Sequence, residues 1–172
     1  TEEKQQERTD QALRELRQIF TDAKAYAELD APAKTNLHFE AMRGLFSGAK
    51  RLFVHCNYVR EIIAAAGFCR ELGISMVLVG GSDSWMVTEL LRENNIPVVL
   101  ADIHRLPSRE DEAIDMPYRL PYFLRQAGVK FAISSHGFWQ IRNLPFQAGT
   151  AGGYGLDPEA MLQSITVDAA SI

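Results

Sequence analysis

The sequence predicts an α/β protein built from consecutive βα units, and three observations carry this prediction. Short apolar runs rich in strand-favouring residues are each followed by a segment with the apolar periodicity of an amphipathic helix. Four such pairs occur after residue 50, and no hairpin signal joins any two of the runs. Because each crossover is roughly 20 to 30 residues long, successive strands have enough chain between them to pair in parallel.

Local signals set the limits of these elements. Gly73 follows the first helix in the position of a C-terminal cap, Pro117 opens the third helix, and Asp157 caps the last one ahead of Pro158. The predicted strands span residues 51–56, 75–79, 97–101 and 129–134, and the predicted helices span residues 59–72, 82–94 and 117–126, with a partly helical stretch over 137–148 and a last helix from about residue 157.

Two architectures are compatible with four βα units in succession. One is a doubly wound four-stranded sheet with a ligand at its switch point, and the other is half of a (β/α)8 barrel. Both have apolar parallel strands and amphipathic helices, so the pattern alone does not separate them. The lack of a G-x-G-x-x-G fingerprint or P-loop counts against a nucleotide-binding doubly wound sheet.

The sequence predicts a helical segment over residues 1–50, ahead of the four βα units in residues 51–172. A long helix over residues 1–29 carries an apolar stripe, and Pro32 ends this region. A short helix follows over residues 36–47, with Asn36 as its N-cap. The stripe of the first helix consists of Leu13, Leu16, Ile19, Phe20, Ala23, Tyr26 and Ala27, and Leu37, Ala41 and Leu45 share one face of the second.

Composition excludes several classes of function. The chain has 172 residues, 47% of them hydrophobic, and a net charge of -4, which is too mild to predict nucleic acid or a membrane surface as a partner. No apolar run approaches the ~20 residues of a membrane span. Cys56 and Cys69 are expected to be reduced core thiols. The chain starts at Thr1 without a methionine or signal peptide, so we expect a cut end, and the compartment stays open.

Three of the four histidines fall at or just past the carboxyl ends of predicted strands: His55, His104 and His136. The carboxyl ends of parallel strands share one edge, so we expect the three imidazoles to emerge on the same rim. There an imidazole can ligate a metal or move a proton near neutral pH, and three of them would be enough for a catalytic zinc site. The alternative for each is a hydrogen bond to a neighbouring loop.

Other segments at this rim have two interpretations each. Gly80, Gly81 and Ser82 form either an anion-binding turn or a tight turn. The charged loop over residues 104–116 is either a lid or a solvated crossover. Arg142 and Asn143 either bind a substrate carboxylate or lie in solvent.

Four stretches of the sequence resemble one known family. They are FVHCN with REIIAAAGFCRELGISMVLVGG; ENNIPVVLADIHRLPSRED; AGVKFAISSHG; and RNLPFQAGTAGGYGLDPEAMLQSITVDAA. From about residue 10 onward the chain resembles the C-terminal half of a metal-dependent amidohydrolase of the imidazolonepropionase-like branch. This resemblance implies half of a (β/α)8 TIM-like barrel, with the four strands corresponding to about the fifth to the eighth.

The resemblance also implies a site. His55 matches the family's metal-ligating histidine on the fifth strand, and His136 stands about where the eighth strand carries an aspartate that ligates metal and accepts a proton. We therefore predict His55 and His136 as metal ligands and His136 as a catalytic residue. His104, Arg142 and Asn143 are the predicted substrate-binding residues. The chain departs from the family near Val79 and Gly80, where the sixth-strand histidine is missing, and at Asp168 and Ala169, which replace an asparagine and a proline.

The function implied is hydrolysis of a C–N bond in a small-molecule amide or cyclic amide, with a divalent metal, zinc first, in the complete protein. The first-strand His-x-His pair of the family is not in this chain, so we expect the fragment alone to be inactive. The alternative is a degenerate, non-catalytic barrel that serves as a binding or assembly module. An open half barrel exposes two strand edges and an apolar face, so the expected partners are the missing N-terminal half and further copies of the chain.

Overall fold

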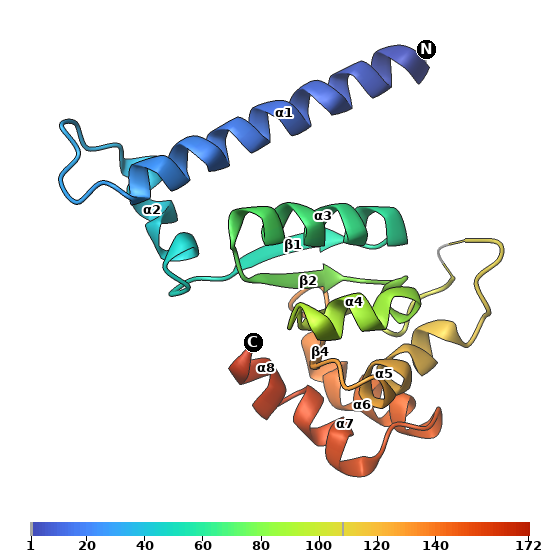
Figure 1. Ribbon diagram of the computed structural model, residues 1–172. Coiled ribbons are helices and arrows are strands. Elements are labelled where there is room, and N and C mark those ends of the chain that lie inside the picture. Colours follow the sequence, from blue (N-terminus) through green and yellow to red (C-terminus); the bar gives the residue numbers. More distant parts are fainter. Residues whose placement is uncertain (1, 108) are drawn as a thin grey trace. The chain divides into compact units, whose positions relative to one another are not determined.

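The structure, a computed structural model, describes residues 2–107 and 109–172 (Figure 1). Thr1 of the predicted long helix and Ser108 of the predicted lid loop lie outside the described residues. The chain forms two compact units. The first comprises residues up to Arg51 together with Cys69–Ser75, and the second comprises Leu52–Phe68 and Met76–Ile172.

The first unit is built around helices α1 (Glu2–Ala27) and α2 (Leu37–Phe46). The Tyr26 and Phe39 rings pack with centroids 5.6 Å apart, and the Tyr26 hydroxyl donates a hydrogen bond of 2.6 Å to Glu40. This hydrogen bond is the main reason why the pKa of Glu40 lies below its ordinary value. Asn36 accepts hydrogen bonds from the backbone N–H groups of His38 and Phe39, which confirms it as the N-cap of α2.

The apolar stripes of these two helices are buried only in part. In α1, Phe20 and Tyr26 are buried, whereas Leu13, Leu16 and Ile19 are exposed. In α2, Leu45 is buried, but Leu37 is 78% exposed and Ala41 is also exposed. The reason is that polar contacts between Tyr26, Glu40 and Arg43 fix which side of α2 meets α1, and spacing alone does not reveal them.

The second unit holds one parallel sheet with the sequential strand order β1-β2-β3-β4. His55 pairs with Val79 in register, and Ala101 pairs with Ser134. A doubly wound sheet reverses its strand order at a switch point, whereas a barrel does not, so this order corresponds to half of a TIM-like barrel. The four strands are β1 (Leu52–Cys56), β2 (Met76–Gly80), β3 (Val98–Ala101) and β4 (Phe131–Ser134).

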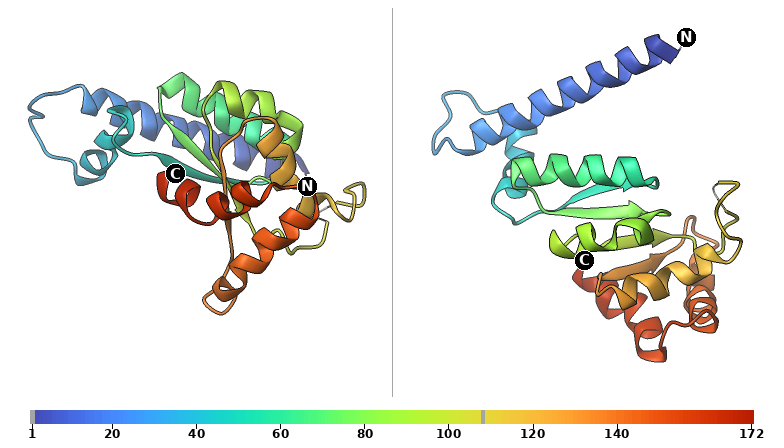
Figure 2. Two further views of the ribbon diagram at one scale, coloured as in Figure 1. Left: turned by 90° about the horizontal axis from the view of Figure 1, so that it is seen from below. Right: turned by 45° about the vertical axis from the view of Figure 1, so that its right-hand side comes forward.

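Helices follow each strand, as the βα pattern predicts. Figures 1 and 2 show α3 and α4 side by side on one face of the sheet, and α6, α7 and α8 contact β4. The predicted N-cap Asp157 is confirmed, since its carboxylate accepts the Ala160 N–H at 2.8 Å. The elements are α3 (Val59–Leu72), a 3-10 turn (Ser84–Val87) running into α4 (Thr88–Glu93), α5 (Met116–Gln126), a 3-10 turn (Ile141–Asn143) running into α6 (Leu144–Gly153), α7 (Pro158–Ser164) and α8 (Val167–Ser171).

Helices cover one face of the sheet, and the other face is more exposed at β1. The helix-covered face is closed, with Leu78 and Val98 at 0% exposure and Leu100 at 1%. On the other face, called the inner face here, Phe53 is 53% exposed and His55 is exposed as well. Its remaining residues by alternation are the buried Val77 and Ala132 and the half-buried Val79, Val99, Ala101 and Ser134.

Both cysteines behave as predicted. Cys56 and Cys69 are free and buried, and burial raises the pKa of the Cys69 thiol, which disfavours the reactive thiolate. Within the described residues, no helix has the length and apolar character needed to cross a membrane.

Candidate functional site

The carboxyl ends of β3 and β4 bring polar side chains together on one rim. Asp102 directly follows β3, and Ser135 and His136 directly follow β4. Because Ala101 and Ser134 are register partners, the residues just beyond them are neighbours in space. This is the end of the sheet at which α/β proteins position their chemistry.

An aspartate–histidine pair stands at the centre of this rim. The Nδ1 atom of His136 lies 2.8 Å from Oδ2 of Asp102, and the backbone N–H of His136 donates to the same carboxylate. An ionised carboxylate can only accept, so Nδ1 carries the proton and Nε2 keeps its lone pair. The His136 side chain is 71% exposed, and its imidazole is therefore open to a ligand.

The Asp102 carboxylate is held in its ionised form. Burial by itself would raise its pKa, but hydrogen bonds from Ser135, His136 and Gln147 outweigh burial, and the pKa lies below its ordinary value. The Ser135 hydroxyl donates at 2.8 Å and the Gln147 amide at 3.3 Å. The Asp102 backbone is left-handed, with φ of 48°, a conformation that aspartate tolerates better than most residues.

Gln147 ties this carboxylate to the strand end. It is buried in α6, and while its amide N–H group donates to Asp102, its Oε1 accepts the Ile103 N–H at 3.0 Å. A buried backbone N–H without such an acceptor would be costly. Gln147 therefore links Asp102 and Ile103 on β3's exit to a helix more than 40 residues further along the chain.

His104 lies on the same loop but has another partner. Its Nε2 atom is 2.7 Å from the Thr150 hydroxyl, which itself donates to the Phe146 carbonyl. Because the single hydroxyl proton of Thr150 is donated to Phe146, the Thr150 oxygen accepts from His104, and Nε2 of His104 is the donor. The Tyr118 ring meets the imidazole edge-on at 6.2 Å. These contacts fasten the β3 exit loop to α6, and the substrate-binding role of His104 stays a prediction.

His55 is on the far edge of the sheet from His136. It is exposed on the inner face of β1, and its side chain forms no hydrogen bond or ion pair with the Asp102–His136 pair within the described residues. The edge strands β1 and β4 are three strand spacings apart, about 14 Å along the sheet. Among the described residues, no group of three or more His, Cys, Asp or Glu side chains could hold a metal.

Gly80, the last residue of β2, lies in a crowded turn. Gly80 has φ of 96°, and a Cβ there would lie 2.5 Å from Asn57 Oδ1 and 3.2 Å from the Cys56 carbonyl oxygen. The following turn uses its own amides: Gly81 N–H donates to Cys56 and Ser84 N–H to Gly81. These contacts fit a tight turn and leave those two amides unavailable to an anion.

Asp83 is the structural anchor of the β2 exit. Its carboxylate accepts the Val59 N–H at 3.1 Å and forms an ion pair with Arg109. Its side chain does not cap the helix that follows it, and the predicted helix over residues 82–94 starts as a 3-10 turn. Hydrogen bonds to Asp111 and Asp83 also raise the pKa of Arg109.

The charged loop after β3 is braced at two points. Arg105 and Glu112 form a two-pronged ion pair, with distances of 2.6 and 3.2 Å. Arg109 reaches from this loop to Asp83 on the neighbouring β2 exit. The loop is thus fastened across the rim rather than free in solvent.

Arg142 and Asn143 lie after the site, in the 3-10 turn before α6. Arg142 is exposed, and the Asn143 amide donates to Gln140 at 3.0 Å. No hydrogen bond joins either residue to the Asp102–His136 pair within the described residues. Sequence reasoning missed Asp102, Ser135 and Gln147; a carboxylate directly after an apolar strand was the available signal for Asp102.

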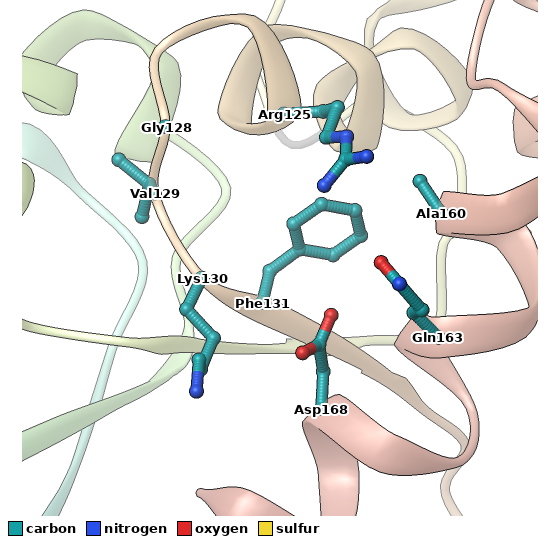
Figure 3. A pocket seen from close by; sticks show the side chains of 8 residues that line it. All are labelled: Arg125, Gly128, Val129, Lys130, Phe131, Ala160, Gln163 and Asp168. Carbon is teal, nitrogen blue, oxygen red and sulfur yellow. The ribbon is translucent and has the colours of Figure 1, made fainter.

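A pocket of about 210 Å3 lies at the other end of β4 (Figure 3). Its cations have partners, since Arg125 bonds to Asp157 at 3.2 Å and Lys130 bonds to Ser171 at 3.1 Å. The pocket is at the amino end of the strand, away from the histidines. Its lining consists of Arg125, Gly128, Val129, Lys130, Phe131, Ala160, Gln163 and Asp168.

Comparison with known proteins gives one structural likeness. No protein-family model matches the chain, and no curated protein does either. The structure is similar to the crystal structure of an amidohydrolase from Thermotoga maritima MSB8, with a TM-score of 0.79 and 24% sequence identity. The match covers 91% of this chain and 43% of that chain. At this level of identity the likeness concerns the fold alone: the chain has an amidohydrolase-like fold that spans less than half of its structural neighbour.

Proposed function

We propose that the complete protein is a hydrolase of C–N bonds in small amides or cyclic amides. The observation that carries the proposal is the Asp102–His136 pair, which stands at the catalytic end of a sheet with an amidohydrolase-like fold. In this proposal the chain is the C-terminal half of an imidazolonepropionase-like enzyme. The 172 residues alone are inactive, because the missing N-terminal half would supply the other side of the site.

His136 is the proposed proton acceptor. Its Nε2 takes a proton from water as the water oxygen attacks the carbonyl carbon, and the imidazolium then gives that proton to the leaving nitrogen as the C–N bond breaks. Asp102 is the proposed positioning residue, because its carboxylate holds Nδ1–H and stabilises the imidazolium. Ser135 and Gln147 keep that carboxylate oriented and ionised.

The proposal includes a divalent metal, zinc first, in the complete protein. In this proposal the chain would contribute His55 as a ligand and the other donors would come from outside it. His136 as a ligand is the alternative to its role as proton acceptor, because the single lone pair on its Nε2 cannot serve both. No step of the proton transfer above is assigned to the metal. His104, Arg142 and Asn143 stay candidates for contacts to the substrate.

Kinetics of the complete protein on a panel of small amides and cyclic amides tests the proton acceptor. His136→Ala should lower kcat by about 10²- to 10⁴-fold. Asp102→Asn should lower kcat by about 10- to 100-fold. His38→Ala is the matched control, since His38 is exposed on α2. An unchanged kcat in the His136 variant would contradict the assigned role.

Metal analysis of the purified complete protein tests His55 separately. We expect bound zinc in the unaltered protein, less zinc in His55→Ala and unchanged zinc in His38→Ala. A metal-free protein, or equal zinc in both variants, would remove His55 from the proposed site.

A second candidate function is a non-catalytic binding or assembly module. The observation that favours it is Val79, the register partner of His55 on β2, because an apolar side chain stands near the position at which the family carries a sixth-strand histidine. A complete protein that binds its substrate class without turnover, and in which His136→Ala changes neither metal content nor binding, would support this alternative.

A further inference from the structure

We propose that the pocket at the amino end of β4 binds a small zwitterion, a molecule with a carboxylate at one end and an ammonium group at the other. The pocket is distinct from the histidine rim, because it lies at the opposite end of the strand. All the residues that line it belong to the second unit. The binding proposal does not depend on the hydrolase activity proposed above.

The size of the pocket fits a small molecule. Its volume is about 210 Å3, whereas pockets for drug-sized ligands start at about 300 Å3. A water molecule takes about 30 Å3 in the liquid, so the pocket has room for about seven waters or one ligand of that size. Val129, Phe131 and Ala160 contribute a buried, apolar part of the lining. The pocket can therefore take a short carbon chain with polar ends.

Arg125 provides the proposed contact to the carboxylate. Its Nε donates to Oδ2 of Asp157 at 3.2 Å, while Oδ1 of Asp157 accepts the Ala160 N–H at 2.8 Å. The Ala160 N–H and the Arg125 guanidinium together hold the pKa of Asp157 below its ordinary value. This ion pair orients the guanidinium and leaves its two terminal nitrogens without a partner among the described residues. Paired guanidinium N–H groups match the two oxygens of a carboxylate.

Two acceptors provide the proposed contact to the ammonium group. The half-buried Asp168 carboxylate lines the pocket and has no hydrogen bond or ion pair within the described residues. The Gln163 amide nitrogen donates to the Glu159 carboxylate at 3.1 Å, which leaves the amide oxygen as an acceptor. Figure 3 shows the Gln163 amide and the Asp168 carboxylate directed toward the Phe131 ring. An ammonium group carries three N–H donors, enough for both acceptors.

The charges in the pocket select for a ligand that carries both signs. Lys130 does not neutralise Asp168, since its Nζ bonds to the Ser171 hydroxyl at 3.1 Å and forms no ion pair with Asp168 within the described part of the chain. Figure 3 shows the Arg125 guanidinium and the Asp168 carboxylate on opposite sides of the Phe131 ring. A simple anion would be repelled by Asp168, and a simple cation would be repelled by Arg125. A zwitterion meets an opposite charge at each end.

The same class of molecule is a product of the reaction proposed above. When a cyclic amide is hydrolysed, the ring C–N bond breaks and the water oxygen bonds to the carbonyl carbon. Both water protons end on the nitrogen, so one molecule carries the carboxylate and the ammonium group. This match alone rests on the proposed function, and it would make the pocket a second binding place for the product, away from the catalytic rim.

Isothermal titration calorimetry on the complete protein tests the class of ligand. The probes are 4-aminobutyrate, butyrate and butylamine, which have the same number of carbon atoms and differ in their charged ends. We expect saturable binding of 4-aminobutyrate and about tenfold weaker binding of the other two, since each lacks one charged contact. Glycine, 3-aminopropanoate and 5-aminopentanoate test the length. If no zwitterion of this panel binds at ~10 mM, or if butyrate or butylamine binds as tightly, the proposal is wrong.

Substitutions locate the binding in the pocket. Asp168→Asn should weaken the binding of 4-aminobutyrate about tenfold without weakening that of butyrate. Arg125→Gln should weaken both ligands. The matched controls are Asp30→Asn and Arg70→Gln, which change exposed side chains outside the pocket and should leave both affinities unchanged. Gln163→Leu replaces Arg125→Gln if the loss of the bond to Asp157 prevents folding, and it should weaken 4-aminobutyrate alone.

His136→Ala separates this proposal from the proposed function. The variant should bind 4-aminobutyrate as tightly as the unaltered protein, because His136 is at the other end of β4, while its hydrolase activity should fall. Binding that is lost in His136→Ala, or that falls equally in Asp168→Asn and Asp30→Asn, would overturn the pocket proposal. Neither outcome depends on whether the protein hydrolyses an amide.

Discussion

The two halves of the rim use their polar side chains in opposite ways. At the exits of β1 and β2, Asp83 and Glu61 accept backbone N–H groups, and Asn57 bonds to Ser82. At the exits of β3 and β4, the Asp102 carboxylate accepts from an imidazole that stays largely exposed. Hydrogen bonds at the first pair of exits complete helix and turn structure, whereas those at the second hold a titratable group toward solvent.

This difference indicates at which strand ends a side chain is available to a substrate. A side chain that caps a helix already accepts hydrogen bonds from backbone N–H groups, so it is not available to a ligand. A glycine in a crowded turn has no side chain that could bind one. The exits of β1 and β2 are therefore structural, apart from His55 on the inner face. The exits of β3 and β4 keep a polar group available, and the proposed function rests on them.

The largest expected effect comes from Gly80→Ala. The left-handed backbone and the displacement of Asn57 together should lower the free energy of unfolding by about 3 kcal/mol. Gly128→Ala is the control, because Gly128 has φ of 71° but open space around its Cβ position, and it should cost about 1 kcal/mol. Urea denaturation measures both. Equal losses in the two variants would mean that the contact with Asn57 is unimportant.

The next effect comes from the other half of the rim. Gln147→Leu removes the acceptor of the buried Ile103 N–H, so the free energy of unfolding should fall by about 1–3 kcal/mol. Gln163→Leu is the control, since that amide bonds to Glu159 at the surface of α7, and a change within about 0.5 kcal/mol is expected. If both variants unfold at the same urea concentration, the Gln147 link does not stabilise the β3 exit.

A smaller effect concerns acid stability. The folded pKa of Asp102 lies below its ordinary 3.8, so its ionised form contributes stability that is fully present above pH 3.8 and is lost as the pH falls through the folded value. The stability difference between the unaltered protein and Asp102→Asn should therefore shrink as the pH falls below 3.8. Asp30→Asn controls for the loss of one carboxylate. A difference that does not change with pH would contradict the assignment.

The smallest effect is a shift in tautomer. With Asp102 ionised, the neutral His136 ring should carry its proton on Nδ1, and nitrogen NMR at a pH where the ring is neutral should detect that form. Asp102→Asn should mix the two tautomers without unfolding the protein. A ring already protonated on Nε2 in the unaltered protein would mean that the pair does not form in solution.

Much of the fold could be predicted because its signals are local. The βα alternation, the Asn36 and Asp157 caps and the position of the strands depend on residues a few places apart. The spacing of apolar residues does not show which of them α1 and α2 bury, because the Tyr26 contacts that orient α2 join residues ten or more places apart.

In the candidate site, too, the features that depend on local sequence could be predicted and those that depend on distant contacts could not. The predicted positions of the strands were enough to place His136 at the rim and His55 within a strand. The sequence by itself did not reveal that His136 and Gln147 converge on Asp102, that His104 turns to Thr150, or that a side chain at Gly80 would collide with Asn57. Those outcomes depend on strand register and on loop conformations, which bring together groups some 34 to 46 residues apart. Local patterns determined the elements, and the pairing of strands decided which polar groups meet.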